Sequence, residues 1–401
     1  MRGLRAEAAA AGQPRAAGEL AGAAFLMATS AIGPGFLTQT AVFTEALGAD
    51  FAFAIALSVL VDVAAQVNVW RVLGVARRRG DELASALVPG LGVVLAAMVA
   101  AGGLVFNIGN VAGCALGLAV FGLPPSVGAS LSAAASVALL LRPRAGRALD
   151  WFAKSLGALM ILLTAVVMVV SSPDYLAALR RAVWPDRLAF LPVVTLVGGT
   201  VGGYITFSGV HRLLDAGIGG EDDVPRLTRA SVMGILVTAA MRVLLFLAVL
   251  GVVTRAGGLD PANPAASAFR LGAGEWGYRF FGLVLWSAAI TSVVGCSYTS
   301  LSFFPRLRAS PGSARAALLA FVGASLGCYL FLGRPVRLLV LAGAVNGLIL
   351  PVTLGVVLLA AGRPGLMGRY RHPAVLRAAG WAAWAVSVVA GALAIREMAM
   401  R

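Results

Sequence analysis

Two glycine-rich runs, each followed by oxygen-bearing side chains, are where this sequence could bind a small solute. The first reads Gly33-Pro34-Gly35, and the second extends from Gly198 to Tyr204 as GGTVGGY. Proline lacks a backbone N–H and glycine adopts non-helical conformations, so each run is expected to interrupt a helix. Packing alone also explains glycine in membrane helices. An interrupted helix leaves backbone groups free, and these bind ions together with neighbouring hydroxyl, amide or carboxylate oxygens.

Other polar residues lie inside long apolar runs. Asn107 and Asn110 are three positions apart and therefore share one face of a helix, and Asn346 lies five residues before a proline. The charged residues in such runs include Asp62 and Arg242. A charge in hydrocarbon costs at least about 2.5–3.5 kcal/mol, so it faces an interior cavity or a partner. We expect these two to form a structural ion pair.

The elements that carry these residues are membrane helices. Of the 401 residues, 60% are hydrophobic and 12% are charged, and the mean hydropathy is +0.90. This composition excludes an ordinary soluble enzyme and a disordered chain. Apolar stretches of sufficient length predict an all-α polytopic protein with eleven transmembrane helices. They lie at about 20–47, 52–75, 90–121, 125–142, 147–171, 188–212, 229–254, 278–303, 314–332, 335–361 and 374–396.

The arginines indicate the topology. The net charge of +15 comes almost entirely from arginine, and with the N-terminus inside, the inner loops hold about twice as many arginines as the outer ones. This bias predicts a cytoplasmic N-terminus and an external C-terminus in a bacterial-type plasma (inner) membrane. The arginines form no patch with interleaved aromatic residues, so we expect no nucleic-acid partner.

The chain divides into a tail and one domain. Residues 1–19 are predicted to be a cytoplasmic N-terminal tail, and 20–401 a single transmembrane transporter domain. The second interruption comes five spans after the first, as expected for a 5+5 inverted repeat with discontinuous helices 1 and 6. Repeat one covers about 20–171, repeat two about 188–361, and an extra helix covers 374–396.

Three segments resemble the NRAMP family of divalent-metal transporters. GPGFL at 33–37 resembles the opening of the family's first span, FNIGNVAG at 106–113 its third span, and LLVLAGAVNGLILP at 338–351 its tenth. The resemblance implies a LeuT-like fold and metal transport. The resemblance places the family's Asp-Pro-Gly-Asn motif at Phe43–Ala46 and its Met-Pro-His motif at Gly202–Tyr204. The two acidic residues of the family's third span correspond to Asn107 and Asn110. A glutamine of the family's tenth span corresponds to Gly343.

The altered residues define the predicted site. We expect substrate binding by Thr40, Thr44, Glu45, Gly202, Gly203, Tyr204, Asn107, Asn110 and Asn346, with Glu45, Thr44 and Gly202 as metal ligands. A pocket of oxygen ligands favours a hard cation such as Mg²⁺ or Mn²⁺. The alternative is a small organic or anionic solute carried by the same fold without metal. A membrane-embedded sensor or enzyme is a third interpretation.

The sequence indicates no cofactor. Cys114, Cys296 and Cys328 lie in apolar runs without CxxC spacing, which excludes a disulfide framework or a zinc site of known spacing. We expect the partners to be the lipid bilayer and a small ion or small-molecule substrate. The oligomeric state stays open, and a monomer is compatible with the sequence.

Overall fold

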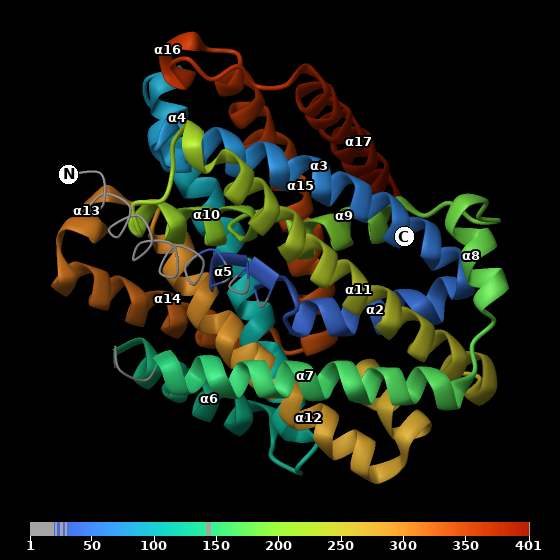
Figure 1. Ribbon diagram of the computed structural model, residues 1–401. Coiled ribbons are helices and arrows are strands. Elements are labelled where there is room, and N and C mark those ends of the chain that lie inside the picture. The colour runs from blue at the N-terminus through green and yellow to red at the C-terminus, as the bar shows by residue number, and fades with distance from the viewer. Residues whose placement is uncertain (1–19, 21, 25–26, 29, 142–145, 401) are drawn as a thin grey trace, which may run out of the picture.

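The computed structural model describes residues 20–400 apart from 21, 25, 26, 29 and 142–145, so the predicted tail lies outside the described residues. The described chain contains helices and no strand (Figure 1). The long helices are α2 (Pro34–Leu47), α3 (Phe51–Ala76), α5 (Leu91–Ala119), α6 (Pro125–Leu141), α7 (Gly146–Ser171), α9 (Phe190–Thr200), α10 (Ile205–Asp215), α11 (Val224–Ala256), α12 (Pro264–Leu301), α14 (Pro311–Leu332), α15 (Pro335–Ala361) and α17 (Ala374–Ala399).

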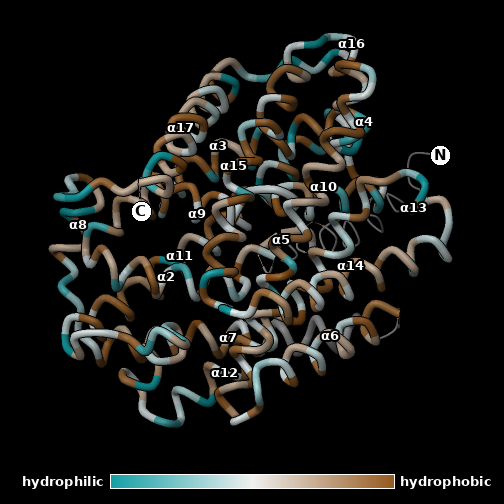
Figure 2. The backbone as a smooth tube through the Cα atoms, turned by 180° about the vertical axis from the view of Figure 1, so that it is seen from behind, coloured by the Kyte–Doolittle hydropathy of each residue, from teal (hydrophilic) through white to brown (hydrophobic). Residues whose placement is uncertain are grey.

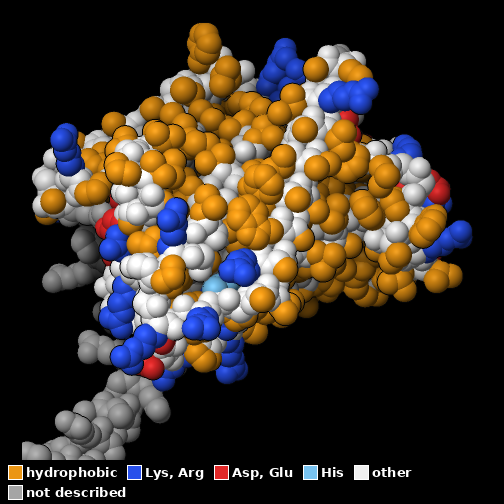
Figure 3. All heavy atoms as spheres, turned by 90° about the horizontal axis from the view of Figure 1, so that it is seen from above, with side chains coloured by type: hydrophobic (Ala, Val, Ile, Leu, Met, Phe, Trp, Pro, Cys, Tyr) orange, Lys and Arg blue, Asp and Glu red, His pale blue; other side chains and the backbone are white. Residues whose placement is uncertain are grey.

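Short helices connect these elements outside the long apolar runs. They are η1 (Gly48–Asp50), α4 (Gly80–Leu87), α8 (Tyr175–Val183), η3 (Glu221–Asp223), α13 (Pro305–Ala309) and α16 (Pro364–Met367). Figure 2 shows hydrophobic residues along most of the long helices and hydrophilic residues mainly at helix ends and in connections. Seen from above in Figure 3, the surface is broadly hydrophobic, with arginines gathered near its edges. These distributions suit a protein surrounded by hydrocarbon.

The predicted spans coincide with the long helices, but the number that cross the bilayer stays a prediction. By length and composition, eight described helical segments can cross, or nine if Ser155–Ser171 and Tyr175–Val183, bent by 107°, form one span. This count treats Pro34–Ala76 as one segment, although η1 separates α2 from α3. It also sets aside α6, which has only 17 residues.

Both predicted interruptions are present. Ala31 is the last helical residue before a bend at Ile32 and Gly33, and α2 begins at Pro34, where a missing N–H removes no intrahelical hydrogen bond. The second break separates α9 from α10 at Val201–Tyr204, where Gly203 has a φ of 53°. That left-handed conformation is accessible to glycine at little cost.

The two ends of the helix assembly are each held by contacts between loops. At one end, Glu45 Oε1 accepts a hydrogen bond from Leu259 N at 2.8 Å, and Asp50 Oδ1 accepts one from Asp186 N at 3.0 Å. At the other end, Arg77 Nη2 donates to Gly219 O at 2.7 Å. The first group joins the outer end of the predicted first span to loops predicted to be external, and the second contains loops predicted to be cytoplasmic.

The buried His372 joins the segment before α17 to α3. His372 Nε2 lies 2.7 Å from Asn68 Oδ1 in α3, and Asn68 Nδ2 donates to Leu376 O at 2.9 Å. Because Asn68 Oδ1 can only accept, the imidazole carries its proton on Nε2. Burial, followed by the positive charges of Arg71 and Arg377, lowers the pKa of His372 from 6.5 to about 4.

This histidine makes the stability of the fold depend on pH. In the unfolded chain His372 binds a proton below about pH 6.5, whereas in the folded chain it binds one only below about pH 4. The free energy of unfolding therefore decreases as the pH falls from 6.5 to 4. We expect the melting temperature in detergent to decline between pH 7 and pH 4.5 more steeply in the wild type than in His372→Gln. Equal slopes in the two proteins would contradict this assignment.

Candidate functional site: a polar centre at two broken helices

The first break faces α5 and α12. A Cβ atom at Gly33 would lie 2.9 Å from Ser292 Oγ and 3.7 Å from Asn110 Oδ1, so these polar groups lie directly against the backbone. Asn110 is fully buried, and neither its amide nitrogen nor its amide oxygen has a hydrogen-bond partner in the described chain. A buried amide with a free donor and a free acceptor is expected to bind a ligand or water.

The second break faces α15. A Cβ atom at Gly203 would overlap Asn346 Oδ1, and one at Gly202 would lie 2.6 Å from Asn346 O. Asn346 Nδ2 donates to Gly102 O and to Ala342 O, both at 2.9 Å, so this side chain joins α15 to α5. Asn346 thus supports the unwound segment, and its Oδ1 makes no hydrogen bond within the described residues.

Tyr204 lies at the centre of this region. Its ring is fully buried and meets Phe106 edge-to-face, with 5.5 Å between ring centroids. Its hydroxyl lies near Asn110 and Cys296. The Cys296 thiol donates to Gly103 O at 3.1 Å. The structure therefore brings together Asn110, Asn346, Gly202, Gly203 and Tyr204 of the predicted set. It also places the sulfur of Cys296 beside them, which the prediction of oxygen ligands alone does not include.

The predicted residues of α2 lie elsewhere. Thr40 Oγ1 donates to Phe36 O at 2.8 Å and Thr44 Oγ1 to Thr40 O at 2.6 Å, so both hydroxyls bond to their own helix. Glu45 is exposed and is 11 residues beyond Pro34, or about 16 Å along a helix. The structure does not place Glu45 or Thr44 beside Gly202, the other predicted metal ligand.

The break also changes the comparison with the family motif. Phe43–Ala46 lies in continuous helix, whereas the break itself contains the pair Pro34–Gly35. The residues on either side of that pair are Gly33 and Phe36, and neither carries a group that binds a metal ion.

Asn107 points away from Asn110. Its Nδ2 donates to Ser325 Oγ in α14 at 2.9 Å. The two asparagines are one turn apart, as predicted, but Asn107 joins α5 to α14 while Asn110 faces the break. Asn107 and Asn110 contact different helices because three residues turn a helix by about 300° rather than 360°.

Gln39 is a residue of the centre that the sequence prediction missed. Its Nε2 donates to Leu339 O at 2.7 Å and lies 2.6 Å from where a Cβ atom of Gly343 would be. The family's span-ten glutamine compares with Gly343, so here an amide from α2 occupies space beside that position. The feature of the sequence that could have predicted this role is the position of Gln39 within an apolar run, four residues after Gly35.

Asp62 and Arg242 are both buried, with 1% of each residue exposed, but the predicted ion pair is not a direct contact. Within the described chain, no Arg242 nitrogen lies within 4.0 Å of the Asp62 carboxylate. Instead, the guanidinium lies 4.4 Å above the centroid of the Phe36 ring, and Thr200 is a polar neighbour of Asp62. The two charges interact only across this longer separation.

Comparison with known proteins identifies the family. A family model described as natural resistance-associated macrophage protein-like matches residues 24–396. The chain belongs to the Nramp family. Nramp proteins are membrane transporters and not enzymes, so the chain is an integral membrane transporter.

Relatives at high identity cover most of the Nramp chain. An uncharacterized membrane protein of Bacillus subtilis, YcsG, is 50% identical over 90% of each chain. One of Haemophilus influenzae is 48% identical, covering 90% of this chain and 91% of the relative.

Solved structures show the same fold. A manganese transporter of Eremococcus coleocola has a TM-score of 0.71 at 15% identity, covering 94% of this chain and 85% of its own. MhsT in complex with L-phenylalanine has a TM-score of 0.65 at 14% identity, covering 93% and 97%. The predicted LeuT-like fold is confirmed.

Replacing Gly203 tests the geometry of the second break. Alanine in a left-handed conformation costs about 1–2 kcal/mol, and its Cβ would also overlap Asn346 Oδ1. We expect a lower melting temperature for Gly203→Ala, partly recovered when Asn346→Ala removes the overlap. Gly327→Ala is the matched control, because no atom from elsewhere in the described chain lies within 4 Å of its Cβ position. Equal melting temperatures for Gly203→Ala and the control would contradict the geometry.

Proposed function

We propose that this Nramp protein is a secondary transporter of a divalent metal cation, which it binds at the two helix breaks. The observation that carries the proposal is the unpaired, fully buried Asn110 amide between the first break and Tyr204. Family membership supports transport, and the Eremococcus coleocola structures of this fold are those of a manganese transporter.

The donor set favours a hard cation with some of its water retained. Asn110 Oδ1, Tyr204 Oη and Asn346 Oδ1 are buried oxygens without a hydrogen-bond partner in the described chain. The C-terminal end of α9 adds partial negative charge at the same place. Neutral oxygens hold Mg²⁺ or Mn²⁺ weakly, which permits release. Cys296 is a neighbouring group that would favour a softer ion.

The second candidate is a small organic or anionic solute. It is favoured because no group of three His, Cys, Asp or Glu residues in the described chain could hold a metal ion. The free donor and acceptor of Asn110 would suit a solute with both a carbonyl and an N–H. The N-terminal ends of α2 and α10 would accept a carboxylate.

Flux through purified protein in liposomes distinguishes the two candidates. We expect uptake of Mn²⁺ or Mg²⁺ that falls at least about tenfold in Asn110→Ala, because a ligand to a charged ion is lost. Glu45→Gln is the control and should retain wild-type flux, since Glu45 lies far along α2. Weak competition by Cd²⁺ is expected from oxygen ligands.

Two outcomes would overturn parts of the proposal. Metal flux that survives in Asn110→Ala but disappears in Glu45→Gln would refute the site. No metal flux, together with thermal stabilisation by small carboxylates or amino acids, would refute metal transport and establish the second candidate.

A further inference from the structure

A line of polar side chains runs along α12 away from the central site. Ser292 faces Gly33 of the first break, and Cys296, one turn later, lies near Tyr204. Ser300 follows after another turn, close enough that a Cβ atom at Gly103 would overlap its Oγ. The buried Thr299 hydroxyl makes no hydrogen bond within the described residues. This line leads from the breaks to the end of the molecule where α4, α10 and α13 meet.

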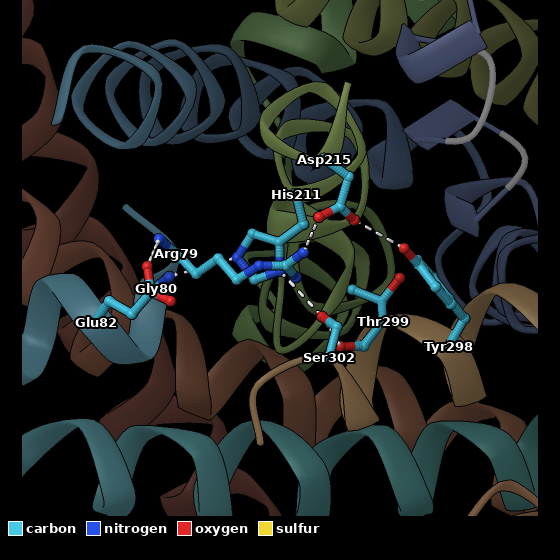
Figure 4. A network of polar contacts seen from close by, with 8 residues as sticks. All are labelled: Arg79, Gly80, Glu82, His211, Asp215, Tyr298, Thr299 and Ser302. Atoms are coloured by element: carbon cyan, nitrogen blue, oxygen red, sulfur yellow. Dashed lines mark hydrogen bonds and ion pairs between the residues drawn. The ribbon is translucent and has the colours of Figure 1, made fainter. Parts of the chain in front are cut away.

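A network closes this line at its end (Figure 4). The guanidinium of Arg79, just before α4, pairs with Asp215, the last residue of α10. Tyr298 of α12 donates its hydroxyl to the other Asp215 oxygen at 2.9 Å. Beside them, His211 Nδ1 lies 3.1 Å from Ser302 Oγ, and Gly80 N donates to His211 Nε2 at 3.4 Å. Three elements distant in sequence are thereby joined.

A cavity lies directly outside this network. It has a volume of about 290 Å³ and is lined by Arg79, Asp215, Tyr298 and Ser302, with apolar residues of α13 and α14 completing its wall. The network therefore separates a polar, buried line on one side from a hollow on the other. Residues in this position would block a route between the polar line along α12 and the cavity.

The barrier consists of contacts that can be broken. The Asp215 side chain is 43% exposed, so water can take the place of its partners when the contacts break. Asp215 also ends α10, the half-helix that begins directly after the break at Tyr204. A rotation at the break would therefore move Asp215 away from Arg79 and Tyr298.

We propose that Arg79, Asp215 and Tyr298 form a gate across the route from the central site to this cavity. When these contacts are made, α10 is held against α12 and the route is closed. When they break, α10 moves and the polar line along α12 opens to the predicted cytoplasmic side. The inference rests on the proposed transport function, but its test does not depend on knowing the substrate.

Cys296 reports whether the route is open. It is fully buried and lies between the gate and the breaks, so a charged thiol reagent reaches it only through an open route. In a Cys114→Ser/Cys328→Ser background, Cys296 is the one thiol left in the chain. The experiment measures its modification by a membrane-impermeant sulfonated methanethiosulfonate, applied separately to right-side-out and inside-out vesicles.

We expect slow modification from both sides in the background protein. In Asp215→Asn and Tyr298→Phe we expect modification from the inside to accelerate about tenfold, because a hydrogen bond to a charged group is lost from the closed state. Asp222→Asn removes an exposed carboxylate at the same end and should leave the rate unchanged.

The proposal is overturned if both gate variants are modified at the Asp222→Asn rate. It is also overturned if modification rises equally from both sides, because that result indicates a loosened structure. Tyr298→Phe removes only a hydroxyl, so it keeps the test decisive if Asp215→Asn does not fold. A positive gate result without metal flux would leave the gate in place and refute only the substrate.

Discussion

The structure depends on keeping two broken helices inside a membrane. Backbone groups released at a break cannot be satisfied by hydrocarbon, so protein has to surround them. Close packing of glycines achieves this here. Cβ atoms at Gly198 or Gly347 would overlap the backbone of the facing helix, so α9 and α15 meet almost backbone to backbone. Asn346 then reaches the unwound segment while bonding to Gly102 and Ala342.

The same constraint links the central site to the gate. Since α10 begins at the break and ends at Asp215, a change of backbone conformation near Gly203 would reach the Arg79–Asp215–Tyr298 contacts through one short rigid helix. Polar groups of α12 lie beside both ends of α10. Substrate binding at the breaks and opening of the route would therefore be coupled through α10.

The sequence predicted the features that depend on local chemistry. Proline and glycine predicted both breaks, and long apolar runs predicted the helices, because these effects act within a few residues. It did not predict which polar side chains meet. Glu45 was assigned by its order after the first glycines, yet a continuous α2 carries it to the far end. Gln39 was missed because its role depends on the absence of a side chain at Gly343, in a helix about 300 residues away.

We propose that a cation binds beside Asn110. The most direct test is whether a negative charge introduced at this position strengthens or weakens metal binding. The measurement is calorimetric binding of Mn²⁺ to purified wild-type protein and to Asn110→Asp. A carboxylate at this position adds a favourable charge for a metal ion, so we expect tighter Mn²⁺ binding by at least about tenfold. Unchanged or weaker Mn²⁺ binding by Asn110→Asp would contradict the account.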